Sequence, residues 1–310
     1  MLNKVLIDFN NLDIGNYQFW QWAYLGYEEL YRWASIISTP LTLWLIAKKV
    51  TLESAKRQDK ISDEQNKQKA LNGYFERMTK LLVEKHLSLK PFGSPEVKAA
   101  RALTLSVLRE LDPERNKQVI QFLSDASLIQ NKLSGSTPTL LREVSLSGVN
   151  LRKAILSHAD LSGSEISSAN LSCTFIENTN LSNAYLICTD LSGACLNNSN
   201  LKDACLIGAI LNGTELKNAD LENANLRNSY ISHADLEGAS LVCAKFGSTS
   251  LKKINLADSN LSGVNLRSFD LNNLYLKRAK YTKDHSKLPD TMFPENFNPK
   301  AAGMIKVENE

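Results

Sequence analysis

The sequence has little charge imbalance, few cysteines and no long apolar run. Its 310 residues carry 36 basic and 33 acidic side chains, so charge alone does not predict a nucleic-acid partner. All five cysteines lie between Cys173 and Cys243 and none has CxxC spacing, which argues against a zinc or redox site and favours a reducing compartment. The first residues also lack the apolar core of a signal peptide.

A repeat of five residues fills the second half of the sequence. Counting by fives from Leu141 to Leu276 gives 28 positions, of which 24 are leucine. The position two residues earlier is Ala, Ser or Thr at all twenty sites from Ala154 to Thr249. No insertion or deletion breaks this register, so the sequence predicts one continuous repeat domain over 139–283.

A period of five fits neither a regular helix nor a regular strand. At about 100° per residue, successive leucines would spread around every face of an α-helix, and in a strand an odd period would alternate them between faces. The leucines can share one interior only if the chain turns in every pentad and winds about a common axis. We therefore predict a solenoid in which Asn, Gly, Ser and Asp supply the turns and a small residue fits beside each leucine.

Several pentads resemble the motif A(D/N)LXX of the pentapeptide-repeat family: HADLS (158–162), SANLS (168–172), NADLE (218–222), NANLR (223–227) and HADLE (233–237). The resemblance implies a mainly β fold, a right-handed quadrilateral β-helix with four pentads per coil and about seven coils, preceded by an α-helical N-terminal region. That order of segments is similar to a group of cyanobacterial members. The expected structural core includes Leu161, Leu181, Leu201, Leu221, Leu241, Phe246 and Leu261.

The repeat loses its small residues at both ends, for example at Val144 and Phe269. Terminal solenoid units expose a cross-section of the core and need capping. We expect the C-terminal tail, 284–310, to fold over the last coil through Phe293 and Phe297.

The first segment, 1–50, is rich in aromatic residues and contains a candidate membrane anchor, 31–49. Residues 33–47 are uncharged and lead into Lys48 and Lys49, but a spanning helix needs about 20 apolar residues. Three alternatives stay open: a segment that spans the membrane, one that lies on it with lipid contact through 17–49, and a partner-facing helix. The residues of the candidate membrane segment are Trp33, Ile36, Ile37, Leu41, Leu43, Trp44, Leu45 and Ile46.

The region between this segment and the repeats is predicted to be helical. Residues 51–90 form a charged stalk that runs into an amphipathic helix, and 91–138 form a helical pair and a linker. Helix starts are marked at Ser94 and Asp112, each of which is followed by Pro and Glu. This pair is a candidate cap for the first coil.

No motif points to catalysis, to a cofactor or to a metal. GxGxxG, GxxxxGK[ST], HExxH and GxSxG are all absent, and the four histidines are far apart in the sequence. His158 and His233 share a position in the pentad but are 15 pentads apart. The sequence therefore argues against an enzyme.

These observations favour a non-enzymatic scaffold or adaptor that binds a protein partner of unknown identity. We predict that it is membrane-associated with its repeat domain in the cytoplasm; a soluble cytoplasmic protein and self-association stay open. The candidate interaction surface consists of Phe175, Tyr185 and Tyr230. The row Asp160, Asn180, Asn200 and Asp220 could serve recognition or simple stacking.

The alternative function is a soluble regulator that binds a DNA-handling enzyme, because several members of the family mimic DNA with an acidic rod. Residues 139–250 contain 7 Lys/Arg and 11 Asp/Glu, whereas 251–283 contain 7 and 2. A rod that is nearly neutral and changes sign along its length argues against such mimicry, and against nucleic acid as a partner.

Overall fold

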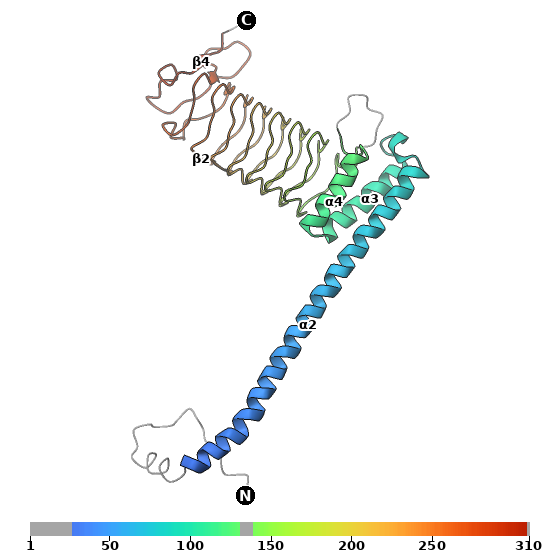
Figure 1. Ribbon diagram of the computed structural model, residues 1–310. Coiled ribbons are helices and arrows are strands. Elements are labelled where there is room, and N and C mark those ends of the chain that lie inside the picture. Colours follow the sequence, from blue (N-terminus) through green and yellow to red (C-terminus); the bar gives the residue numbers. More distant parts are fainter. Residues whose placement is uncertain (1–26, 131–138, 309–310) are drawn as a thin grey trace. The chain divides into compact units, whose positions relative to one another are not determined.

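The computed structural model describes residues 27–130 and 139–308, with side chains from Trp44 onward. The chain divides into two compact units, Met1–Gln65 and Asn66–Glu310. Within the described residues, three α-helices and a short 3-10 helix come first, and a solenoid with four short strands follows (Figure 1). In chain order the elements are α2 (Tyr27–Val83), η2 (Leu87–Leu89), α3 (Pro95–Glu110), α4 (Pro113–Asp125), β1 (Tyr230–Ser232), β2 (Ser250–Lys252), β3 (Lys280–Tyr281) and β4 (Ile305–Lys306).

The repeat domain is a β-helix in which a residue pairs with the residue 20 positions later. Parallel bridges join Asp160 to Asn180 and Asn180 to Asn200. The N–H of Leu161 donates to the carbonyl of Asn180 at 2.8 Å, and the N–H of Asn180 donates back to the carbonyl of Ala159 at 2.9 Å. Paired residues are 20 positions apart, which is four pentads, so the pentads form four rows that run along the helix axis.

Most pentads turn at a residue with positive φ, two positions after the interior residue. Asn178, Asn183 and Asn198 adopt φ values of 54° to 58° there, and Gly193 and Gly208 adopt 63° and 68°. Asn and Gly enter this left-handed region at the lowest cost, which explains why they are frequent in the repeat. The same turn position is occupied by His158, Cys173, Cys188, His233 and Cys243.

The interior holds one large and one small side chain from each pentad. The small residues from Ala154 to Thr249 are all buried, and of the large ones between Leu141 and Leu276 only Leu251 is not fully buried. Thr179 satisfies its buried hydroxyl by donating to the carbonyl of Leu156 at 2.9 Å. The core residues named from the sequence are 0–3% exposed: Leu161, Leu181, Leu201, Leu221, Leu241, Phe246 and Leu261.

The helices α3 and α4 begin at the capping residues that the sequence marks. The side chain of Ser94 accepts a hydrogen bond from the N–H of Val97, and that of Asp112 accepts from Glu114 and Arg115. A proline follows each cap, where its missing N–H costs no hydrogen bond. These caps fix where both helices start.

The C-terminal part of α2 packs against α3 and α4 in a small aromatic core. Tyr74 is buried, and its hydroxyl lies 3.0 Å from the hydroxyl of Thr104. Burial raises the pKa of Tyr74, so the phenol is neutral at physiological pH. The rings of Phe75 and Phe122 lie 5.1 Å apart and extend the contact.

Side chains from the helices occupy the backbone acceptors of the first coil. Within the solenoid such carbonyls accept N–H groups from the preceding coil, as Asn180 does from Leu161. The first coil has no such neighbour. Arg109 donates to the carbonyl of Ser145 at 3.0 Å, and Asn116 donates to that of Asn150 at 2.9 Å. These side chains satisfy carbonyl groups that would otherwise be unpaired at the edge of the first coil.

The chain after the last coil pairs with it in the same way. Met292 donates its N–H to the carbonyl of Val264 at 2.9 Å and accepts the N–H of Leu266 at 2.7 Å. β4 pairs in parallel with β3. This is the segment for which the sequence predicts a cap, and its effect on stability stays a prediction.

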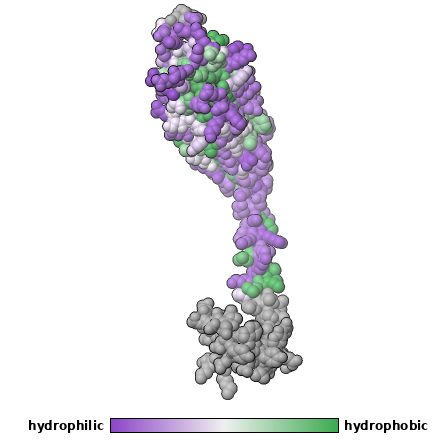
Figure 2. Space-filling view, turned by 90° about the vertical axis from the view of Figure 1, so that its left-hand side faces the viewer, coloured by the Kyte–Doolittle hydropathy of each residue, from purple (hydrophilic) through white to green (hydrophobic). Residues whose placement is uncertain are grey.

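The predicted membrane segment 31–49 lies inside the single helix α2. Among the described residues, the structure contains no helix with both the length and the apolar character needed to span a bilayer. Lys48 and Lys49 follow 15 uncharged residues, whereas a spanning helix needs about 20 predominantly apolar ones. Residues 1–26 and the side chains of 27–43 lie outside the described part. Apolar Trp44, Leu45 and Ile46 on α2 are 51–60% exposed. Figure 2 shows a hydrophobic patch on the helix surface next to the grey residues.

Candidate functional site

The three aromatic residues predicted to form an interaction surface are all exposed, but they lie on different rows. Phe175 is bridged to Cys195, Tyr185 to Cys205 and Tyr230 to Ser250. Their exposed fractions are 52%, 51% and 58%. The structure does not bring them together in one patch, so each has to be considered with its own row.

The row of Phe175 is continuous and has apolar residues at both ends; we call it the 155–275 row. Ile155 is bridged to Phe175, and both side chains are about half exposed. Bridged strands lie about 4.8 Å apart, so these two side chains form one exposed apolar pair. At the other end Tyr275 is 55% exposed. The row consists of Ile155, Phe175, Cys195, Glu215, Asp235, Asn255 and Tyr275.

Sequence reasoning missed Ile155 as a partner of Phe175. The signal was present, because Ile155 stands 20 residues before Phe175 at the same place in its pentad. An isolated exposed aromatic residue needs no explanation on a protein surface. An adjacent pair on a rigid row is a more specific feature.

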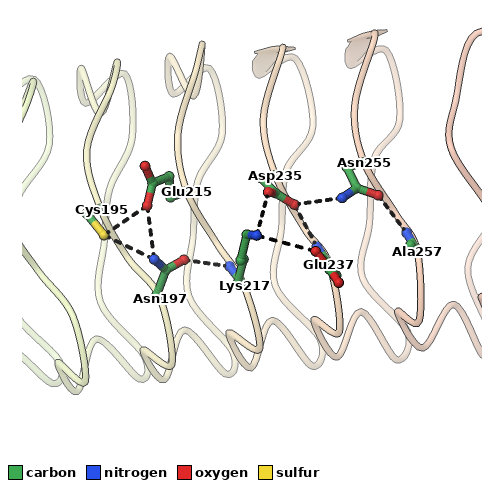
Figure 3. Close-up of polar contacts among 8 residues, drawn as sticks. All are labelled: Cys195, Asn197, Glu215, Lys217, Asp235, Glu237, Asn255 and Ala257. Carbon is green, nitrogen blue, oxygen red and sulfur yellow. Dashed lines mark hydrogen bonds and ion pairs between the residues drawn. The ribbon is translucent and has the colours of Figure 1, made fainter.

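A chain of polar contacts holds the middle of the 155–275 row in place (Figure 3). Asn197 donates to a carboxylate oxygen of Glu215 at 3.0 Å, and its own carbonyl accepts the N–H of Lys217 at 2.9 Å. Asn255 donates to Asp235 at 3.0 Å. Each contact links neighbouring coils, so the side chains are fixed as a set.

Lys217 is the single cation in this chain of contacts. Its ammonium lies 3.2 Å from a carboxylate oxygen of Asp235 and 3.3 Å from one of Glu237. The hydrogen bonds to these two carboxylates raise the pKa of Lys217. Beyond the apolar pair, the carboxylates Glu215, Asp235 and Glu237 outnumber Lys217, so this part of the row is acidic. Glu215 lies between Cys195 and Lys217 (Figure 3).

Cys195 lies between two carboxylates from neighbouring coils. Its sulfur is 3.1 Å from an oxygen of Glu177 and 3.3 Å from an oxygen of Glu215. Burial, then the hydrogen bonds to Glu177 and Glu215, raise the pKa of the Cys195 thiol to about 12. The thiol is therefore protonated at neutral pH and acts as a hydrogen-bond donor, not as a nucleophile.

This environment predicts how fast Cys195 reacts with iodoacetamide. Because a raised pKa leaves little thiolate at pH 8, we expect alkylation of Cys195 to be slower than that of the exposed Cys173 and Cys188. Its rate should rise about tenfold per pH unit from pH 7 to 9.5 without a plateau. Glu177→Gln should speed the reaction at pH 8, and peptide mass spectrometry measures each site.

Unfolding the chain in urea provides the control for this prediction, because it removes the neighbouring carboxylates and should make Cys195 react like the others. A plateau in the Cys195 rate below pH 9 in the folded protein would contradict the assigned environment.

The row of Asp160 and Asn180 is satisfied internally. Asn180 donates to Asp160 at 3.3 Å, and Asn200 donates to Asn180 at 3.3 Å. Each side chain also accepts the backbone N–H two residues later, as Asn180 does from Ser182 at 3.2 Å. These bonds favour stacking over recognition as the role of this row.

The remaining cysteines and histidines offer no cluster for chemistry. All five cysteines are free thiols. In the described ranges, 27–130 and 139–308, no three His, Cys, Asp or Glu side chains are placed to hold a metal ion. His158 and His233 lie at turns, with φ of 65° and 55°.

Comparison with known proteins identifies the repeat. A family model for pentapeptide repeats (8 copies) matches residues 145–183, 164–203, 204–241 and 239–276. No curated protein sequence matches the chain.

Three solved structures illustrate the similarity. A pentapeptide repeat protein from Nostoc PCC 7120 is 32% identical over 36% of this chain and 84% of its own, with a TM-score of 0.23. Rfr23 from the cyanobacterium Cyanothece 51142 is 27% identical over 38% of this chain and 87% of its own, with a TM-score of 0.28. QnrB1, a plasmid-mediated fluoroquinolone resistance protein, is 19% identical over 53% and 83%, with a TM-score of 0.30.

The assignment rests on the repeat itself, since the matched residues are those whose leucines fill the interior of the β-helix. Proteins of this family form right-handed β-helices. The chain belongs to the pentapeptide-repeat family.

Proposed function

We propose that this protein is a non-enzymatic scaffold that binds a protein partner along the 155–275 row. The observation that carries the proposal is the exposed pair Ile155 and Phe175 at one end of that row. Exposed aromatic residues on a rigid surface are typical anchors of protein interfaces. The polar contacts from Asn197 to Ala257 keep the adjoining surface in one conformation, which lowers the entropic cost of binding.

Charge gives the proposed surface its specificity. Glu177 stands two residues after Phe175, and Glu215 lies two rungs along the row from it; neither carboxylate has an ion-pair partner among the described residues. A partner segment with an apolar side chain followed by a basic one would complement both features.

Regulation of a DNA-handling enzyme is the alternative function. A regulator that mimics DNA needs a strongly acidic surface, because DNA presents one negative charge per about 1.7 Å. Here basic residues interrupt the acidic ones, as Lys217 does between Glu215 and Asp235.

Attachment of 17–49 to a membrane surface stays a prediction. The exposed Trp44, Leu45 and Ile46 fit lipid contact and equally fit contact with a protein.

The proposal predicts which aromatic residue matters for binding. A partner is first captured from native extract by the full chain and identified by mass spectrometry, and its dissociation constant is then measured. Phe175→Asp should weaken binding at least about 30-fold, the loss expected for an interface anchor. Tyr185→Asp and Tyr230→Asp, equally exposed but on other rows, should change the constant less than about threefold.

Equal losses from all three substitutions would contradict the choice of row, and no loss from Phe175→Asp would contradict the proposed surface. Circular dichroism of each variant controls for folding.

A further inference from the structure

A cavity of about 680 Å³ lies between the last coil and the C-terminal tail. Arg267 and Tyr281 line it from the coil side, and Phe293, Phe297 and Lys300 line it from the tail. Cavities of about 300–1,000 Å³ are typical of sites for small molecules. Nothing in the 155–275 row uses this cavity.

Buried hydroxyl groups hold the two walls of the cavity together. Thr291 donates to the carbonyl of Leu261 at 2.9 Å and accepts the N–H of Thr282 at 3.0 Å. Thr282 in turn donates to the carbonyl of Pro289 at 2.6 Å. Both threonines are buried, so the tail is fixed against the coil in one arrangement. The cavity is thus preformed.

The walls carry four cations from separate segments: Arg267, Lys283, Lys300 and Lys306. In the described part of the chain none of these four forms an ion pair. Two carboxylates, Asp284 and Asp290, also line the cavity, and Asp290 accepts the N–H of Asp284 at 2.7 Å. The lining therefore has an excess of two positive charges over negative ones, which favours an anion.

An apolar wall accompanies this charge. The rings of Phe293 and Phe297 are stacked with centroids 5.2 Å apart, and Tyr281 contacts Phe293 edge to face at 5.5 Å. Phe293 and Phe297 are only partly buried, so they offer ring surface to a ligand. Cations beside aromatic rings are suited to a molecule that joins phosphate groups to a planar ring.

We propose that this cavity binds a phosphorylated small molecule of nucleotide size. Its phosphates would contact Arg267, Lys283, Lys300 and Lys306, and its ring would lie against Phe293 and Phe297. Such a site goes beyond the scaffold function, and it would let a small anion stabilise the docked tail, because a ligand that binds only the folded state stabilises that state.

The test is isothermal titration calorimetry of the full chain with ATP, without added metal. Inorganic pyrophosphate supplies the charge without the ring, and adenosine supplies the ring without the charge. We expect ATP to bind more tightly than pyrophosphate and adenosine not to bind. Lys300→Ala should weaken ATP binding about tenfold, as expected for loss of one charge-assisted hydrogen bond. Phe297→Leu should lower the affinity for ATP to that for pyrophosphate.

The matched control is Lys252→Ala, which removes an exposed cation of β2 that does not line the cavity and should leave ATP binding unchanged. An equal loss in both lysine variants would indicate non-specific attraction and overturn the proposal. So would absence of ATP binding at millimolar concentration, equal affinity for pyrophosphate and ATP, or binding of a polyglutamate peptide in place of ATP. Melting curves of each variant confirm that it is folded.

Discussion

Replacing Leu196 with aspartate is expected to destroy the stability of the β-helix. Leu196 is fully buried in the interior, where a carboxylate would have no partner. Burying an unpaired charge costs more than about 4 kcal/mol, which is a large part of the stability of a typical domain. Because coils contact only their neighbours, the damage should centre on the coil that contains residue 196.

Hydrogen exchange followed by mass spectrometry measures this effect coil by coil. The matched control is Asn198→Asp, which adds the same charge two residues later at an exposed turn with φ of 58°. The control should change stability by less than about 0.5 kcal/mol. If Leu196→Asp left the exchange pattern unchanged, the interior position of the repeat leucines would be wrong.

Removal of the C-terminal tail, 284–310, is expected to have the second largest effect. Its loss would break the backbone bonds from Met292 to Val264 and Leu266 and expose the core at the last coil. Burial of each large apolar side chain contributes about 1.5–3 kcal/mol, so a loss of roughly 5 kcal/mol is expected. The melting temperature should then fall by about 10–20 °C, as measured by differential scanning fluorimetry.

A point substitution separates tail docking from the effect of truncation. A Cβ atom at Gly263 would lie 2.8 Å from Pro289 of the tail and 2.9 Å from the sulfur of Cys243. Gly263→Ala should therefore lower stability more than Gly213→Ala, which has a similar positive φ but no atom within 4 Å of the new Cβ. An equal loss in both variants, together with an unchanged melt of the truncated chain, would contradict a capping role.

The interior and the turns could be predicted from the sequence because both depend on local rules. A leucine every fifth residue requires one turn per pentad, and the left-handed turn residue favours Asn or Gly, as at Asn178 and Gly193. The helix starts at Ser94 and Asp112 also follow from short patterns. Such features need no knowledge of distant residues.

The surface features could not be predicted in the same way. Arg109 and Asn116 satisfy carbonyls more than 30 residues away, and no local pattern marks that role. Phe175, Tyr185 and Tyr230 share a place in the pentad, yet the 20-residue coil distributes them over three rows. Composition and length left open whether 31–49 spans a membrane, lies on one or contacts a protein, and the side chains of 27–43 lie outside the described part.

A photo-crosslinking scan around one coil tests most directly whether the 155–275 row is the binding surface. Benzoylphenylalanine is placed in the full chain at Phe175, Asn180, Tyr185 and Asp190, one position on each row, and irradiated with the partner bound. We expect partner adducts at position 175 and none above background at 180, 185 or 190. Strong adducts at 185, or adducts of equal strength at all four positions, would contradict the 155–275 row as the binding surface.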